Sequence, residues 1–349
     1  MIKTIIDKLY KYNCLEKEEI IYLLKNLDEN SREYLINKAY STRLKSYGKT
    51  VFLRGLIEVT NFCTKTCLYC GIRAENTNAD RYRLTKEEII SSCENGYNLG
   101  YKTFVLQGGE DPFFTDEFLV ELITEIKYKF PECAVTLSLG EKSYESYKKL
   151  YDAGADRYLL RHETANPKLY SSLHPKMSFE NRITCLKNLK KIGYQVGAGF
   201  LIGLPNQTIE DLAMDLLFLK NLKPHMVGIG PFIPQKDTPL RNEQGGDSYT
   251  TITLLSIIRL LLPDVLLPAT TALGTIDSTG REKAFKAGAN VIMPNLSPFE
   301  CRAKYSLYDG KVFTDNESAE EKRKIEEKIK NAGFEPVMVR GDNITWKRI

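Results

Sequence analysis

Three cysteines lie within eight residues in the stretch CTKTCLYC, at Cys63, Cys67 and Cys70. No further cysteine or histidine follows within the next twenty residues. A structural zinc site normally has four protein ligands and a catalytic zinc site usually relies on histidine, but the chain has only three histidines. Three thiolates can instead bind three irons of a 4Fe-4S cluster, whose usual ligand set is four cysteines, and leave the fourth iron open. The spacing therefore predicts a cluster with a free position for a small molecule.

The segments around this loop alternate between apolar β-rich runs and stretches of helical periodicity, which is typical of a parallel sheet with crossover helices. We expect eight strands, namely LRGLIEVT from Leu53, KTFVLQ from Lys102, AVTLSL from Ala134, DRYLLR from Asp156, QVGAGFLI from Gln195, HMVGIG from His225, LLPATT from Leu266 and ANVIMP from Ala289. Eight repeats predict an α/β protein with a (β/α)8 TIM-type barrel. The cysteines follow the first strand, so they should lie at the C-terminal mouth, where barrel enzymes build active sites.

Helix boundaries are marked by short polar residues and glycines. Thr85 and Glu88 form a capping box, and Ser178 and Thr208 are similar starts. Gly193 is placed to end the helix before the fifth strand.

The barrel accounts for residues 49–311, and both flanking segments are expected to be accessory. Residues 1–48 contain two Lys- and Glu-rich helical segments. Residues 312–349 contain a charged helix, EEKRKIEEKIKNAG, and a small hairpin, PVMVRGDNITW, which we expect to pack on the barrel.

Composition and charge argue against several classes of protein. The 349 residues carry 49 Lys and Arg against 45 Asp and Glu, spread evenly, so no nucleic-acid partner is expected. No run of 18 apolar residues and no signal-like start occurs, so we expect a cytoplasmic protein without a membrane partner. Eight cysteines, most of them isolated, fit a reducing compartment. Four of them are expected to be small buried hydrophobes: Cys14, Cys93, Cys133 and Cys185.

Glycines and charged residues follow the second and fourth strands. The second ends in QGGEDP, where Gly108 and Gly109 permit either close backbone approach or a simple tight turn. The fourth ends in RHETANP, where Arg161 and Glu163 share one face because side chains alternate along an extended chain. The same alternation turns His162 away, so we interpret it as a packed histidine.

The cysteine loop after the first strand, with Tyr69 just before the last cysteine, resembles that of the radical S-adenosylmethionine (SAM) superfamily. The resemblance implies that Cys63, Cys67 and Cys70 bind one 4Fe-4S cluster and that SAM chelates the open iron. It further implies that an electron from the cluster splits SAM into methionine and a 5′-deoxyadenosyl radical, which makes the protein an oxygen-sensitive enzyme.

The resemblance also implies SAM contacts. The stretch Gln107, Gly108, Gly109 and Glu110 would receive the methionyl amino group, and Tyr69 lies in the ligand loop. Arg161 would bind the carboxylate, with Arg182 as a second candidate, and Glu163 would bind the ribose hydroxyls, which suits a guanidinium fork and a carboxylate acceptor. The backbone of Ile229 and Gly230 would meet the adenine edge, with tight packing of the strand end as the alternative.

Longer motifs narrow the resemblance. They are RYRLT at 81–85, LQGGEDP at 106–112, TLSLGE at 136–141, DRYLLRHETANP at 156–167, VGIGPFIPQKDTPL at 227–240, PATTALGTI at 268–276 and GREKAFKAGANVIMPN at 280–295. Jointly they resemble the HydE family, radical maturases that help to build the active-site cluster of FeFe-hydrogenase. This implies action on a cysteine-ligated Fe(CO)2CN precursor made by HydG, with HydF as another partner and flavodoxin or ferredoxin as reductant.

Inward positions of the strands predict a substrate cavity. Its lining would be Thr136, Ser138, Arg157, Met226, Thr270, Thr271 and Met293. Hydroxyls and an arginine could receive an anionic complex, and methionines could form a soft apolar wall. The alternative is a packed interior, since inward residues fill the core of many barrels.

Other interpretations remain. A methylornithine synthase-like mutase acting on lysine also matches PFF after GEDP, and another paralogue with a small amino-acid-derived substrate is a further alternative. Biotin synthase needs a second cluster on further strand cysteines, which this chain lacks, and no cysteine follows Cys301. A non-catalytic iron–sulfur carrier would need four ligands and no site for Arg161 and Glu163. His174 and His225 have no ligand spacing and receive no role.

Overall fold

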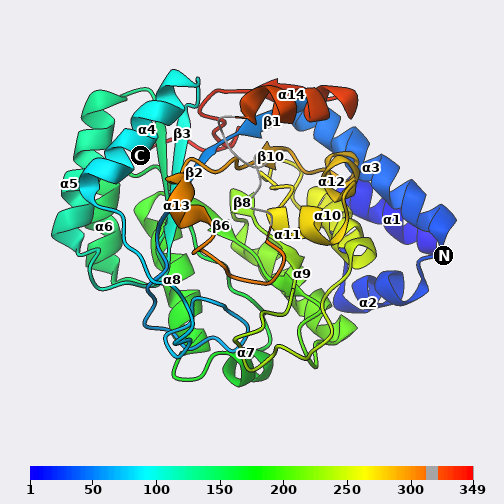
Figure 1. Ribbon diagram of the computed structural model, residues 1–349. Coiled ribbons are helices and arrows are strands. Elements are labelled where there is room, and N and C mark those ends of the chain that lie inside the picture. The colour runs from blue at the N-terminus through cyan, green and yellow to red at the C-terminus, as the bar shows by residue number, and fades with distance from the viewer. Residues whose placement is uncertain (312–320, 349) are drawn as a thin grey trace.

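The strands of the computed structural model, which describes residues 1–311 and 321–348, form a parallel ring with helices outside it (Figure 1). A continuous sheet has the order β2-β3-β4-β5-β6-β8. The bounds are β2 (Gly55–Thr60), β3 (Thr103–Gly108), β4 (Ala134–Ser138), β5 (Arg157–Leu159), β6 (Gln195–Ala198) and β8 (Met226–Val227). The remaining strands are β1 (Thr50–Leu53), β7 (Leu201–Ile202), β9 (Gly230–Pro231), β10 (Val291–Ile292) and β11 (Glu335–Val337). The α/β class is confirmed.

The ring closes through the segment 266–269, which forms bridges in place of a full strand. The parallel bridges are Leu266 with Met226, Pro268 with Val291 and, beyond β10, Asn295 with Leu56. β10 also pairs with β1, which continues into β2. The predicted TIM-type barrel is therefore confirmed. Its seventh strand is reduced because Pro268 has no N–H to donate to a ladder.

Two expected strands are split near the mouth. QVGAGFLI becomes β6 and β7, and HMVGIG becomes β8, while Gly230 starts β9. At the first break, a Cβ atom on Gly199 would lie 1.9 Å from the carbonyl oxygen of Gly228. Gly199 has φ 153°, so only glycine is accommodated without strain. The two strand ends thus meet by direct backbone contact.

Helices cover the outside of the ring. The longer ones are α4 (Lys86–Asn98), α5 (Asp116–Lys129), α6 (Tyr144–Asp152), α8 (Phe179–Ile192), α9 (Ile209–Leu222) and α10 (Ser248–Leu261). Shorter ones are α7 (Pro167–Leu173), α11 (Thr271–Ile276), α12 (Gly280–Lys286) and α13 (Phe299–Arg302). The predicted starts at Thr85, Ser178 and Thr208 are confirmed as caps, and Gly193 ends α8 with φ 110°.

Three helices precede the barrel, where two were expected. They are α1 (Ile2–Tyr12), α2 (Lys17–Asn26) and α3 (Glu29–Tyr47). The missed boundary is Asp28, whose side chain accepts a hydrogen bond from the N–H of Ser31 and starts α3. Arg43 of α3 is buried and donates to the carbonyl oxygens of Gly48, Thr50 and Ala289. This helix is therefore tied to the barrel through backbone groups.

The C-terminal segment turns back beneath the ring. The expected charged helix is present as α14 (Lys322–Asn331), while residues 312–320 lie outside the described residues. The expected hairpin is wrong, because β11 pairs in parallel with β1 and no strand follows it up to residue 348.

Residues 340–343, here called the floor segment, instead cross the N-terminal end of the barrel. Their contacts are Thr103 Oγ1 to the Arg340 carbonyl (2.8 Å), Arg54 to the Gly341 carbonyl (3.0 Å) and Asn343 to the His225 carbonyl (3.1 Å).

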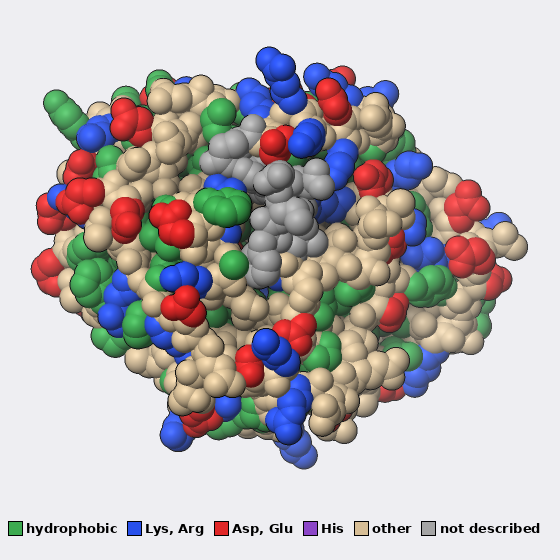
Figure 2. Space-filling view, viewed as in Figure 1, with side chains coloured by type: hydrophobic (Ala, Val, Ile, Leu, Met, Phe, Trp, Pro, Cys, Tyr) green, Lys and Arg blue, Asp and Glu red, His purple; other side chains and the backbone are tan. Residues whose placement is uncertain are grey.

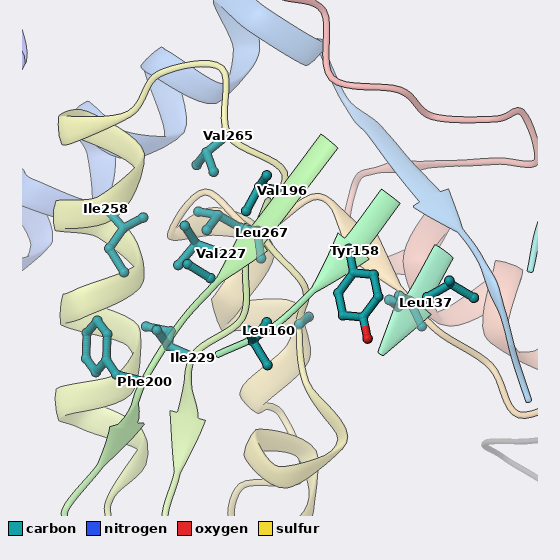
Figure 3. Close-up of a cluster of buried hydrophobic side chains, with 14 of the residues drawn as sticks. Leu137, Tyr158, Leu160, Val196, Phe200, Val227, Ile229, Ile258, Val265 and Leu267 are labelled. Carbon is teal, nitrogen blue, oxygen red and sulfur yellow. The ribbon is translucent and has the colours of Figure 1, made fainter. Parts of the chain in front are cut away.

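A layer of apolar side chains lies between the strands and the outer helices (Figure 3). Its buried members include Leu137, Tyr158, Leu160, Val196, Phe200, Val227, Ile229, Ile258, Val265 and Leu267. Burying each large apolar side chain contributes about 1.5–3 kcal/mol. The layer therefore fixes the strands from outside, so that their inward side chains and ends can carry polar groups.

The surface shows no large region of one charge on the face seen in Figure 2, where Lys and Arg are intermixed with Asp and Glu. None of the described helices is long and apolar enough to cross a membrane. Cys93, Cys133 and Cys185 are buried as predicted, but Cys14 is exposed. It lies in the turn after α1, where Asn13 ends the helix with a left-handed backbone.

Candidate active site

The three cysteines of the loop after β2 lie at the C-terminal mouth as free, partly exposed thiols. The backbone N–H groups of Lys65 and Glu110 both donate to Cys63 Sγ at 3.4 Å. N–H groups aimed at a ligating sulfur favour its thiolate form and tune the potential of a bound cluster. The loop and the end of β3 thus hold Cys63 between them.

The three thiols influence one another's pKa. Burial raises the pKa of all three, that of Cys70 to about 12. Cys63 raises the pKa of Cys67 and Cys70 further, so the sulfurs lie near one another. Within residues 1–311 and 321–348, no three His, Cys, Asp or Glu side chains meet around a single metal ion. Three neighbouring thiols fit a 4Fe-4S cluster, in which each thiolate would bind a different iron.

The QGGE stretch passes directly against the cysteine loop. A Cβ atom on Gly109 would lie 2.1 Å from the carbonyl oxygen of Phe62 and 2.7 Å from Cβ of Cys63. Gly109 is therefore required by the close approach of two backbones. Gly108 is crowded by a side chain, since a Cβ atom there would lie 2.8 Å from Cγ2 of Thr60. Both glycines thus allow the QGGE stretch to pack closely, while their contact with a ligand stays a prediction.

The side chains on either side of the glycines also contact the loop region. Oε2 of Glu110 lies 3.3 Å from Nζ of Lys65, and burial raises the pKa of Glu110. The side-chain amide of Gln107 lies 3.5 Å from the hydroxyl of Tyr305. The end of β3 is thus a polar wall beside the cysteines.

Arg161 and Glu163 point the same way, as the alternation predicts, with Nε of Arg161 3.2 Å from Oε1 of Glu163. Glu163 has φ 66°, a left-handed backbone that costs about 1–2 kcal/mol outside glycine. Hydrogen bonds to Gly199 (3.0 Å) and from Leu201 (3.2 Å) hold it there. Oε2 of Glu163 is buried without a hydrogen-bond partner among the described residues. An unpaired buried oxygen is unfavourable, so it is suited to accept from a ligand hydroxyl.

His162 faces outward, toward α9, and is fully buried, which confirms a packed histidine. Its Nε2 lies 3.3 Å from Oδ1 of Asp215 without making a hydrogen bond, and its Nδ1 accepts from the N–H of Gly199 at 3.3 Å. Burial lowers the pKa of His162 to about 3 and raises that of Asp215 well above its ordinary value. Asp215 also accepts from the N–H of Ala165. The pair anchors the strand end that carries Arg161 and Glu163.

Arg182, the second candidate for a ligand carboxylate, already has protein partners. Its Nε donates to Oε1 of Glu141 at 2.7 Å, and Nη1 donates to the carbonyl oxygen of Arg161 at 2.9 Å. Both side chains of this ion pair are largely buried. In this arrangement Arg182 orients the backbone of Arg161.

The remaining predicted SAM contacts are Tyr69, Ile229 and Gly230, and they differ in whether a side chain or only the backbone is available to a ligand. The hydroxyl of Tyr69 lies 2.8 Å from Nε2 of His174. The side chain of Ile229 belongs to the outer apolar layer, so only its backbone is available to a ligand (Figure 3). A Cβ atom on Gly230 would lie 3.2 Å from Oγ1 of Thr270, so this backbone position is also crowded.

The interior of the ring is partly open. Along β4 and β5, Ser138 and Leu159 are partly exposed while Leu137 and Tyr158, which point outward, are buried. Since outward residues lie under helices, the partial exposure of inward residues indicates a space inside the ring. The predicted lining residues Ser138, Thr270, Thr271 and Met293 are partly exposed, whereas Thr136, Arg157 and Met226 are buried deeper.

The deeper level carries polar atoms without partners. Nε of Arg54, Nε of Arg157 and Oγ1 of Thr136 have no hydrogen-bond partner among the described residues. Thr136 and Arg157 are register neighbours on β4 and β5. Arg157 Nη2 pairs with Asp342 of the floor segment at 2.6 Å, and Arg54 Nη1 lies 3.3 Å from Met226 Sδ. Each unpaired buried donor costs about 1–3 kcal/mol, so an acceptor-bearing ligand would be favoured here.

Comparisons with known proteins agree with this geometry. The Radical SAM superfamily model matches residues 57–219. The chain is 49% identical over 310 residues to the [FeFe] hydrogenase maturase subunit HydE of Thermotoga maritima, covering 89% of this chain and 88% of that protein. The chain belongs to the radical SAM superfamily. Members of this superfamily are enzymes that use a 4Fe-4S cluster and SAM, so this radical SAM protein is an enzyme.

Another relative of this radical SAM enzyme is 3-methylornithine synthase of Methanosarcina acetivorans, 30% identical over 95% of this chain and 93% of that protein. The crystal structure of methylornithine synthase (PylB) superposes with a TM-score of 0.83 at 26% identity, covering 95% of this chain and 97% of that one. Both relatives therefore match the barrel and its flanking segments together.

Sequence reasoning missed several residues of this radical SAM site. Arg54, Glu141, His174 and Asp342 contact the predicted residues. Arg54 was findable, because it lies two residues before the inward position of Leu56. Asp342 gave no local signal, since its partner Arg157 lies 185 residues away in the sequence.

Proposed function

We propose that this enzyme is a radical SAM maturase of FeFe-hydrogenase that acts on a cysteine-ligated Fe(CO)2CN precursor. Identity of 49% to a HydE protein over most of both chains supports the maturase role. In this role its partners would be the maturases HydG and HydF, with flavodoxin or ferredoxin as reductant, in the cytoplasm.

The observation that carries the substrate class is the set of unpaired donors deep inside the barrel. Nε of Arg54, Nε of Arg157 and Oγ1 of Thr136 are buried without partners among the described residues. Burial lowers the pKa of both guanidinium groups, while Asp342 raises the pKa of both and Asp156 also raises that of Arg157. An anionic complex with acceptor ligands would satisfy the unpaired donors. Met226 beside Arg54 adds a soft apolar contact.

The residues of the mouth have roles that follow from their chemistry. When bound, a 4Fe-4S cluster held by Cys63, Cys67 and Cys70 supplies the electron that splits SAM into methionine and a 5′-deoxyadenosyl radical. Arg161 would bind the methionyl carboxylate and Glu163 the ribose hydroxyls. The crowded glycines of the QGGE stretch keep the backbone close enough to bind the methionyl amino group. The floor segment closes the opposite end and excludes water from the interior.

The test uses anaerobically reconstituted, dithionite-reduced enzyme with SAM, and compares the synthetic cysteine-iron dicarbonyl cyanide complex with buffer. We expect the complex to stimulate formation of 5′-deoxyadenosine and an adenosylated species to be trapped by mass spectrometry. If the rate of SAM cleavage is the same with and without the complex, the proposed substrate is contradicted, but the assignment as a radical SAM enzyme is retained.

The same assay with lysine tests the second candidate, a methylornithine synthase-like mutase. This candidate is favoured by the superposition with methylornithine synthase at TM-score 0.83. Stimulation by lysine, with 3-methylornithine as product, would replace the maturase proposal. Iron analysis accompanies both assays, and about four irons per chain are expected for one cluster. About eight irons would contradict a single cluster.

A further inference from the structure

The turn between α7 and α8, residues 173–177, lies against the cysteine loop. The N–H of Leu68 donates to the carbonyl oxygen of Leu173 at 3.0 Å. Oγ1 of Thr66 donates to the carbonyl oxygen of Pro175 at 2.9 Å. Further along the turn, Met177 Sδ lies 3.8 Å from Cys67 Sγ. Contacts from both ends of this turn therefore brace the part of the loop that contains Cys67 and Cys70.

The fourth contact is made by the side chain of His174. Its Nδ1 lies 2.8 Å from the carbonyl oxygen of Tyr170, and its Nε2 lies 2.8 Å from the hydroxyl of Tyr69. A carbonyl oxygen only accepts hydrogen bonds, so Nδ1 carries the proton. Nε2 is then the acceptor, and the hydroxyl of Tyr69 donates to it. Both nitrogens of the ring are satisfied in a single tautomer.

This contact is enclosed by protein. His174 is 1% exposed, and burial lowers its pKa to about 4, so the ring is neutral near pH 7. It stacks on Tyr170 with a centroid distance of 4.2 Å and an interplanar angle of 22°. Tyr69 meets the ring edge-on at 5.4 Å and 85°. The imidazole cannot rotate without breaking two hydrogen bonds and this packing, so it is a rigid support for Tyr69.

We propose that His174 is a positioning residue of the cofactor loop, which fixes Tyr69 and thereby the segment Cys67–Cys70 through the Tyr69–His174 hydrogen bond. Tyr69 lies between the second and third cysteines, so an error in its position moves the adjacent sulfur of Cys70. The bond sets the separation of the thiols that receive the cluster and the orientation of the Tyr69 ring at the mouth. His174 acts through Tyr69 and touches neither cluster nor substrate.

The test is a double-mutant cycle with His174→Phe, Tyr69→Phe and the combination, in anaerobically reconstituted enzyme. Two quantities are measured, the rate of iron loss to a chelator and the dissociation constant for SAM. Each single substitution leaves one buried group unpaired, so we expect about tenfold faster iron loss. Because both substitutions remove the same hydrogen bond, the double variant should lose iron no faster than either single variant.

Two further variants separate positioning from general loss of structure. His174→Gln retains an acceptor near the place of Nε2 and should recover most of the wild-type iron retention. His225→Phe, a matched change on the floor side of the barrel, should leave iron loss within about twofold of wild type. Wild-type iron loss and SAM binding in His174→Phe would overturn the proposal. The proposal would also be overturned if the increases in the rate of iron loss caused by the two single substitutions multiplied in the double variant.

Discussion

The two ends of the barrel treat buried polar groups in different ways. At the floor, Arg157 is paired with Asp342 at 2.6 Å and hydrogen-bonded to the carbonyl oxygen of Arg340. At the mouth, burial raises the pKa of the cysteine thiols, and Oε2 of Glu163 has no partner among the described residues. Protein groups thus pair the Nη atoms of Arg157 at the floor, although its Nε and that of Arg54 stay unpaired among the described residues, whereas the mouth needs ligands. Removing a protein partner at the floor should therefore damage folding, and substitutions at the mouth should damage binding.

The largest effect is expected at the mouth. Cys67→Ala should abolish cluster binding, because two remaining thiolates leave two irons of a 4Fe-4S cluster without protein ligands. Iron content and the visible absorption of reconstituted protein measure this directly. The matched control is Cys93→Ala, since Cys93 is a buried thiol of α4 away from the loop. A full cluster in Cys67→Ala would refute the ligand assignment.

The floor should respond through stability. Asp342→Ala removes the carboxylate paired with the fully buried Arg157. Because Asp342 is itself 28% exposed, we expect a loss of about 1.5–3 kcal/mol, below that of a fully buried pair. Urea unfolding of the apoprotein measures the loss. Asp152→Ala breaks an exposed pair with Lys148 and should cost less than about 1 kcal/mol. Equal free energies of unfolding for the two variants would contradict the prediction that the Arg157–Asp342 pair stabilises the protein more than a surface pair does.

Arg161→Ala tests whether a residue at the mouth affects SAM binding without affecting cluster binding. The variant should retain its iron, since Arg161 contacts Glu163 and is not a ligand. Its SAM affinity should fall about 10–100-fold, because a hydrogen bond to a charged group contributes about 1.5–3 kcal/mol. Calorimetric titration with SAM measures the change, with the exposed Arg241→Ala as control. Unchanged affinity in Arg161→Ala would contradict the carboxylate contact.

A further expected effect is a pH dependence of stability shared by both ends. Burial lowers the pKa of His162 near the mouth to about 3 and that of His225 at the floor to about 4. The unfolded chain, with histidine pKa near 6.5, then binds protons that the folded protein does not. Stability is therefore full above about pH 6.5 and falls toward pH 4, by at most about 1.4 kcal/mol per pH unit for each histidine. Urea midpoints that stay constant from pH 7 to pH 5 would contradict this.

The barrel was predictable because its signals are local. Strands such as AVTLSL and caps such as Thr85 with Glu88 are determined by neighbouring residues, and the structure confirms them. The third N-terminal helix was missed because only Leu27 and Asp28 separate it from α2, and its start depends on the cap formed by Asp28 with Ser31. The C-terminal hairpin was wrong because PVMVRG has the alternation of a strand, but its partner is β1 at the start of the barrel.

The candidate site likewise contains residues that short-range sequence patterns predict and residues that they do not. The cysteine spacing and the shared face of Arg161 and Glu163 follow from short-range periodicity, and the structure brings these groups to one mouth. His174 has no ligand spacing, and its contact with Tyr69 spans 105 residues of sequence. Such contacts depend on how the turn after α7 packs on the loop after β2. No pattern within either segment indicates that packing.

The floor segment also sets an order of events during synthesis. Asp342 follows Arg157 by 185 residues, so at about 5–20 residues per second it leaves the ribosome roughly 10–40 s later. During that interval, the nascent barrel contains a guanidinium group whose carboxylate has not yet been translated. The floor can therefore form only after the strands of the barrel have been synthesised. On a ribosome stalled before residue 340, this end of the barrel should still be open to solvent and to chaperones.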